Sequence, residues 1–81
     1  MYKNKSEFGT NNVCGPKIRQ FRKARPEKTS QRKLAEMLQI EGLDVDKNAV
    51  QRIENGSRFV TDIELKIIAK VLKVSYEDLL N

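Results

Sequence analysis

The clearest pattern of hydrophobic and polar positions in the chain lies between Asp46 and Gly56. Val50 and Ile53 are three residues apart, so a helix would place both side chains on its inner side. The pattern predicts a helix over residues 47–55, because an aspartate before it can cap its start and a glycine after it can end it. Its outer side would carry only polar and cationic side chains, namely Lys47, Asn48, Gln51 and Arg52.

Two helices are predicted before this one. The first begins at Gly15-Pro16, because proline suits the first turn of a helix, and it ends before Pro26. The second begins at a Ser30 cap and is closed by Gly42. The inward positions are Ile18, Phe21, Arg22 and Ala24 in the first helix, and Leu34, Ala35 and Leu38 in the second.

Two further helices are predicted after Thr61 and Ser75. Thr61 and Glu64 have the spacing of a capping box, in which each side chain bonds the backbone N–H of the other residue. Ser75 and Asp78 repeat that spacing. Aliphatic residues at helical intervals from 63 to 80 predict that both helices contribute to the core. Because no stretch alternates as a strand would, the predicted fold class is all-α, with about five helices.

Size and charge add the expected organisation of the chain. Its 81 residues make one small domain. Residues 1–33 carry ten Lys and Arg against two Glu, whereas residues 34–81 carry six against nine acidic residues. A chain that concentrates positive charge in this way suits a polyanionic partner. Residues 1–14 are polar and lack apolar periodicity, so they predict a flexible N-terminal arm, and residues 15–81 the folded domain.

The composition also disfavours several classes of protein. No apolar run approaches the roughly 20 residues of a membrane span, and the N-terminus lacks the apolar region of a signal peptide. The single cysteine, Cys14, fits a reducing cytoplasm. With no histidine in the chain, it also has no partner for nucleophilic catalysis. We therefore expect a cytoplasmic protein that is not an enzyme and that uses no cofactor, metal or membrane.

The outer side of the 47–55 helix has the chemistry of a surface that reads DNA. Arginine and lysine bond guanine in the major groove, and asparagine and glutamine bond adenine. An ordinary solvated helix has a similar composition, so the interpretation depends on the helix before it.

Four segments of the chain carry a family resemblance: I-R-Q-F-R-K-A-R (18–25), S-Q-R-K-L-A-E-M-L (30–38), N-A-V-Q-R-I-E-N-G (48–56) and I-I-A-K-V-L-K-V-S-Y-E-D-L-L (67–80). Together they span about three quarters of the chain, and their order resembles the Cro/lambda-repressor-like, or XRE-type, helix-turn-helix family. The resemblance implies a compact five-helix lambda-repressor-like DNA-binding domain. Two segments depart from the family pattern. R-P-E-K-T (25–29) is longer than usual, and Q-I-E-G-L-D (39–44) implies either a longer second helix or a bulging linker.

The resemblance also implies roles for individual residues. Lys47, Asn48 and Arg52 match the positions at which relatives read bases in the major groove, with Gln51 as a further candidate. Gln31 matches a position that holds a backbone phosphate, and the helix start at Ser30 adds N–H groups that suit an anion. The full set of predicted phosphate ligands is Lys17, Arg19, Ser30, Gln31, Asn55, Ser57 and Arg58.

Arg22 and Glu54 fall on positions that form an ion pair in relatives of this family. We expect this pair to orient the domain against DNA rather than to read bases. The alternative is two independent surface charges.

The predicted function is sequence-specific binding of double-stranded DNA by a bacterial or phage transcriptional regulator, acting as a repressor. One helix-turn-helix reads only a few base pairs, so a homodimer on a palindromic operator is expected. The alternative is a protein-interaction module, such as an antitoxin or a bridging adaptor, with the same fold. A polar, cationic outer face on the third helix favours DNA, and an apolar face would favour a protein partner.

Overall fold

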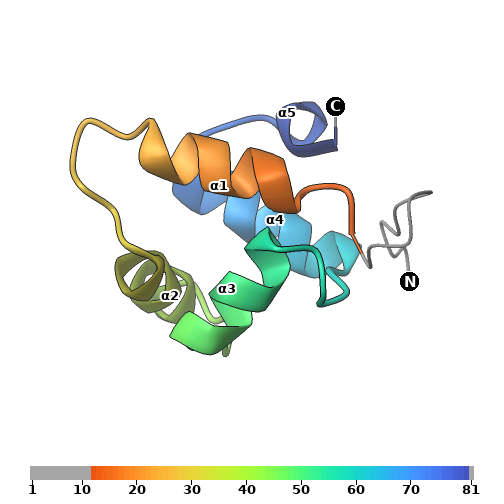
Figure 1. The fold of residues 1–81 in the computed structure, drawn as a ribbon, viewed down its shortest axis with the longest axis horizontal. Helices are drawn as coiled ribbons and strands as arrows, with labels where there is room; N and C mark the ends of the chain where they lie inside the picture. Colours follow the sequence, from red (N-terminus) through yellow and green to blue (C-terminus); the bar gives the residue numbers. More distant parts are fainter. Residues whose placement is uncertain (1–11, 81) are drawn as a thin grey trace.

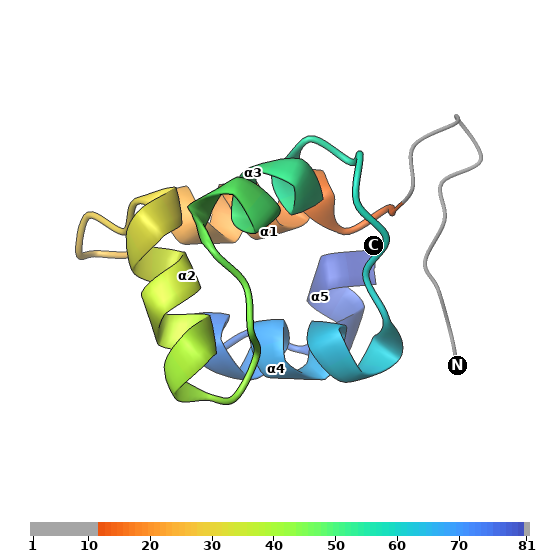
Figure 2. The same ribbon diagram turned by 90° about the horizontal axis from the view of Figure 1, so that it is seen from below.

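The computed structural model describes residues 12–80, which form five α-helices (Figure 1). Within the described residues, this all-helical architecture confirms the predicted fold class. α3 packs against both α1 and α2, and α5 lies beside α1 and α4 on the side of the molecule away from α2 (Figures 1 and 2). The helices are α1 (Gly15–Lys23), α2 (Gln31–Ile40), α3 (Lys47–Glu54), α4 (Asp62–Leu72) and α5 (Tyr76–Leu80).

Side-chain caps start the helices where the sequence predicts them. The Ser30 hydroxyl accepts a hydrogen bond from the Lys33 N–H at 3.0 Å, and the Asp46 carboxylate accepts one from the Ala49 N–H at 2.8 Å. At α4, the reciprocal bonds of the capping box are both present. Each cap satisfies a backbone donor that the helix itself leaves unpaired, which fixes the first turn.

α2, α3 and α4 all end in a Schellman motif, in which one N–H bonds the carbonyl three residues back and the next N–H reaches five residues back. The first of these residues has a left-handed backbone conformation in each case. In α2 and α3 it is a glycine, Gly42 (φ 92°) and Gly56 (φ 85°). In α4 it is Lys73 (φ 59°), although a side chain disfavours this conformation.

One apolar core joins the five helices. Side chains with at most 1% exposure come from every helix, and the loop residue Val60 lies among them. The fully buried side chains from the helices are Ile18, Leu34, Leu38, Val50, Ile53, Leu65, Ile68 and Leu79. This core fixes α3 with its apolar side inward, because Val50 and Ile53 belong to it.

Several details of the helices differ from the sequence predictions. α3 ends at Glu54, one residue earlier than predicted, and α1 ends at Lys23, three residues before Pro26. Ala24, predicted to face inward, is exposed. Ile63 was expected in the core but is 58% exposed, because it lies in the first turn of α4 on the side that no other helix covers.

The connector between α2 and α3 spans residues 41–46. Of the two predicted alternatives, a longer second helix or a bulging linker, the structure has the second, because α2 stops at Ile40 and the linker contains the added residues. Val45 is buried, and its carbonyl accepts a 2.7 Å hydrogen bond from the Gln39 side chain. The connector is therefore anchored to α2 rather than lying over α3.

The last residues of the predicted N-terminal arm are packed into the domain. Asn12 and Cys14, which the sequence places in the arm, are 2% and 0% exposed. Residues 1–11 lie outside the described residues, so a flexible arm over them stays a prediction. Between residues 12 and 80, no helix has the length and apolar character to cross a bilayer.

Candidate nucleic-acid interface

α3 presents two chemically different sides. Ala49, Val50 and Ile53 are buried, and so is Glu54, the only acidic residue of the helix. All four predicted base-reading residues are exposed: Lys47, Asn48, Gln51 and Arg52. The outer side of α3 therefore offers amide and cationic groups with no carboxylate among them, which is the donor-rich chemistry that base edges and phosphates accept.

The N-terminal end of α2 lies next to this side of α3 (Figure 2). A shallow hollow of about 480 Å³ between them is lined by Ser30, Gln31, Arg32 and Lys47, with Arg22 beneath. The Ser30 oxygen accepts the capping bond, and its hydroxyl hydrogen stays available as a donor. Cationic side chains and unpaired helix N–H groups thus meet in one place, which suits an anion.

Arg22 and Glu54 form an ion pair inside the domain. The Arg22 Nε donates to Glu54 Oε2 at 2.6 Å and Nη2 donates to Oε1 at 3.0 Å, so the contact is bidentate. The side chains are 10% and 3% exposed. Arg22 Nη1 also donates to the Thr29 carbonyl at 2.9 Å, which ties α1 to the loop before α2 as well as to α3.

Gln31 belongs to the same cluster of polar groups. Its side-chain Nε2 donates to Glu54 Oε1 at 3.1 Å. An amide nitrogen carries two hydrogens, so one remains for a ligand on the surface. The Glu54 carboxylate therefore holds Gln31 in place at the rim, in addition to pairing with Arg22. No spacing in the sequence predicts this link.

A second hollow, of about 260 Å³, opens between α1 and α3. It brings together three predicted ligands, Arg19, Gln31 and Asn55, with the predicted base reader Gln51. Lys17 is half-buried on α1 and lines neither hollow. The structure thus gathers most of the predicted contacts on α2 and α3 and at one side of α1.

The turn after α3 holds the remaining predicted phosphate ligands. The Asn55 side-chain oxygen accepts a bond from the Ser57 N–H at 2.9 Å, and the Ser57 hydroxyl contacts the Arg52 carbonyl at 3.4 Å. Arg58 does not point freely outward. Its Nη2 donates to the Glu64 carboxylate at 3.0 Å, and the two side chains are 29% and 17% exposed.

The Glu64 carboxylate is stabilised in its charged form. Burial alone would raise the pKa of Glu64, but hydrogen bonds from the Thr61 N–H and from Arg58 outweigh burial and lower this pKa below its ordinary value. A phosphate that binds Arg58 would have to share the guanidinium with Glu64.

Asn12 is a positioning residue that the sequence did not reveal. Its side-chain nitrogen donates to the Ile53 carbonyl at 3.0 Å and to the Arg58 carbonyl at 2.8 Å, while its oxygen accepts from the Gly15 N–H at 2.7 Å. Asn12 therefore joins the start of α1 to the end of α3 and the following turn. A polar segment before the first helix gave no signal of this role, because the contacts of Asn12 with Ile53 and Arg58 are more than 40 residues away in sequence.

Gly15 allows α1 and α3 to approach this closely. A Cβ at Gly15 would clash with the Ile53 carbonyl oxygen and would lie 2.8 Å from the Glu54 carbonyl oxygen. Both contacts are to backbone atoms, which a side-chain rotation cannot relieve. The glycine predicted only as a helix start thus also fixes the packing of α3 on α1.

Cys14 is a free thiol in the core. Burial raises the pKa of Cys14 to about 12, so the thiol is neutral at physiological pH and a poor nucleophile. The part of the chain that the structure describes contains no group of three or more side chains suited to holding a metal ion.

Comparison with known proteins gives one match. A family model described as helix-turn-helix matches residues 18–79, a span that contains α2, α3 and all of the interface except Lys17. No curated protein and no solved structure matches the chain.

Proposed function

The chain belongs to the XRE-type helix-turn-helix family, and we propose that it regulates transcription by binding a specific double-stranded DNA sequence with α3 in the major groove. The observation that carries this proposal is the exposure of Lys47, Asn48, Gln51 and Arg52 on a helix whose other side is fixed in the core. These residues would contact base edges.

Phosphate contacts on both sides of α3 would set its position in the groove. On one side, Ser30 and Gln31 at the start of α2 would hold the backbone, with Arg19 and Lys17 of α1 extending the contact. On the other side, the turn after α3 offers Asn55, Ser57 and Arg58. The Arg22–Glu54 pair would act from beneath this surface, because it ties α1 and α3 together and bonds Gln31 through Glu54.

The regulator would act as a repressor in the cytoplasm, by occupying an operator and excluding polymerase. Eight residues of α3 span only a few base pairs, so a homodimer on a palindromic site with half-sites about one helical turn apart would supply the specificity. A protein partner or the amount of the protein itself would control occupancy.

The alternative function, a protein-interaction module such as an antitoxin or adaptor that uses α3, is less well supported. Such a module would place apolar side chains on the outer side of α3, as interface centres are depleted of charge. The exposed residues of α3 are instead two cations and two amides.

The proposal is tested by measuring the affinity of the protein for duplex DNA over a salt series. Neutralising about five or six phosphates predicts a loss on the order of a hundredfold or more between about 50 and 200 mM salt. Arg19→Gln, at an exposed predicted phosphate ligand, should lower the slope, and Lys66→Gln, which removes an exposed charge from α4, serves as its control. A salt response that is flat would contradict DNA binding.

A further inference from the structure

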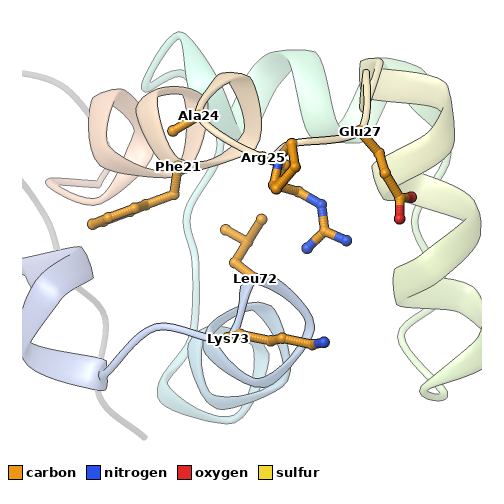
Figure 3. Close-up of a pocket in the computed structure, with 7 residues that line it drawn as sticks. Phe21, Ala24, Arg25, Glu27, Leu72 and Lys73 are labelled. Carbon is orange, nitrogen blue, oxygen red and sulfur yellow. The ribbon is translucent and has the colours of Figure 1, made fainter.

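Two hollows flank the C-terminal end of α4. The first, of about 430 Å³, lies between α4 and the end of α1, and Phe21, Arg25 and Leu72 are among its lining residues (Figure 3). The second, of about 290 Å³, lies between α4 and the end of α2 and includes Ile40. Lys73 lines both hollows. We call the two hollows and the lysine between them the α4-end surface.

Apolar side chains are left uncovered on the α4-end surface. Ile40 is 82% exposed, the highest value among the large hydrophobic residues that the structure describes. Met37 beside it and Phe21 in the first hollow are half-buried. Apolar groups that gather in this way, rather than lying singly, mark a surface that another molecule covers.

The positive charges of this surface are only partly neutralised. Lys70 pairs with Glu41 at 2.6 Å, but none of the ion pairs within residues 12–80 involves Arg25 or Lys73. Glu27 also lines the first hollow and forms no ion pair with either cation, so the two cations outnumber the one carboxylate there (Figure 3). The Arg25 guanidinium bonds the Thr29 hydroxyl at 3.1 Å and the Val71 carbonyl at 3.3 Å, which holds it beside the first hollow (Figure 3). A carboxylate between the two cations would meet charge that the domain itself leaves unpaired.

The backbone conformation at Lys73 makes glycine a suitable replacement with which to test its side chain. Gly42 and Gly56 take the left-handed position in the Schellman motifs of α2 and α3, where no side chain resists that conformation. α4 has a lysine at the same position, with φ 59°. Glycine would adopt the same conformation without a steric cost, so Lys73→Gly removes the side chain and keeps the helix end.

The α4-end surface is separate from the candidate DNA interface. Its lining residues come from α1, α2 and α4 and from the residues that directly follow these helices, and none belongs to α3 or to the predicted phosphate ligands. A molecule bound there would leave the outer side of α3 accessible. The inference therefore does not rest on the proposed DNA binding.

We propose that the α4-end surface binds a short acidic segment of a partner protein. The segment would place one apolar side chain in each hollow and a carboxylate between Arg25 and Lys73. Two hollows separated by a cation suit an amphipathic helix with apolar residues one turn apart. Nucleic acid would need cations along a continuous track, whereas here apolar side chains and the carboxylates of Glu27 and Glu41 interrupt the cations.

The test uses a synthetic helical peptide that carries two leucines four residues apart, with glutamates around them. The peptide is titrated into the full-length, ¹⁵N-labelled protein. Amide shifts at Arg25, Ile40 and Lys73, with none along α3, are expected. A matched peptide with lysines in place of the glutamates should not bind.

Variants assign the contacts. Ile40→Ser should weaken peptide binding by about tenfold or more, and Lys73→Glu should do the same, whereas Lys66→Glu gives the same charge change elsewhere on α4 and should have little effect. Lys73→Gly distinguishes a role of Lys73 in folding from a role in recognition. It should raise the Tm, yet it should still weaken binding of the peptide. DNA affinity of Ile40→Ser should equal that of the unaltered protein, so failure of either proposal is seen independently.

Four results would overturn the proposal. They are no binding of the glutamate peptide, equal binding of the lysine peptide, shifts along α3 instead of the α4 end, or affinity unchanged in both Ile40→Ser and Lys73→Glu. Sedimentation of the unaltered protein and of Ile40→Ser could give a fifth contradicting result. If the unaltered protein is a dimer and Ile40→Ser is a monomer, a second copy of the chain covers this surface.

Discussion

α3 and α4 start with the same kind of side-chain cap and end in the same backbone motif, but different forces hold them. α4 has eleven residues and buries five apolar side chains. α3 has eight residues and buries three apolar side chains and one carboxylate. At its C-terminal end, buried polar groups reach α3 from other elements: Arg22 bonds Glu54, and Asn12 bonds the Ile53 carbonyl.

The difference shows how a helix can keep one side free for a partner. A helix that leaves its outer side polar has less apolar surface with which to fix its orientation. Apolar packing alone would leave the angle of α3 less well defined. Because hydrogen bonds and ion pairs are directional, a few buried ones can fix that angle. Breaking these contacts should therefore affect α3 more than equivalent surface changes on the other helices.

The largest loss of stability is expected for Arg22→Ala. It leaves the Glu54 carboxylate buried without its partner, so the free energy of unfolding should fall by about 3–5 kcal/mol. Urea denaturation followed by circular dichroism measures the change. Lys23→Ala, at the neighbouring exposed position, is the control and should stay within about 0.5 kcal/mol. Equal effects of the two substitutions would mean that the pair does not hold α3.

A smaller loss of stability is expected for Asn12→Ala. Two backbone carbonyls and one N–H each lose a hydrogen bond, and a buried group left unsatisfied costs about 1–3 kcal/mol. Asn48→Ala removes the same amide from the exposed side of α3 and should leave stability nearly unchanged. If DNA binding depends on the orientation of α3, Asn12→Ala should also weaken it in protein that is still folded at the assay temperature. Thermal unfolding and DNA titration of both variants check this.

The smallest loss of stability is expected for Glu64→Gln, at the start of α4. Because folding lowers the pKa of Glu64, its charge contributes stability above the pKa of the unfolded chain and loses it as pH falls through the folded pKa. The variant should be less stable by about 0.5–1 kcal/mol at pH 7. In acid titrations of stability, the gap between the two proteins should close as the pH falls through the lowered pKa of Glu64. A gap that widens in acid would contradict the lowered pKa.

Local signals made much of the fold predictable. Ser30, Asp46 and Thr61 cap helices through bonds to residues three positions away, so their roles can be read from spacing alone. The two sides of α3 follow from the three-residue interval between Val50 and Ile53. These patterns depend on neighbours in the chain, which the sequence displays directly.

The structure adds what depends on distant partners. Asn12 acts on Ile53 and Arg58, and nothing near it in sequence predicts that contact. Arg58 meets Glu64 because a turn brings them together, so it is less available to phosphate than its place after α3 suggested. Exposure of Ile40 could not be foreseen either, because it depends on where α2 ends and on how α4 packs beside it.

Selection of binding sites from random DNA, with the unaltered protein and with Arg52→Ala, tests whether the outer side of α3 reads base edges. We expect a palindromic consensus for the unaltered protein. For Arg52→Ala we expect lost preference at one base pair of each half-site, with affinity for the original site reduced by about 1–3 kcal/mol. Lys66→Ala should select the original consensus. A consensus unchanged by Arg52→Ala would contradict the assignment of α3 as the reading helix.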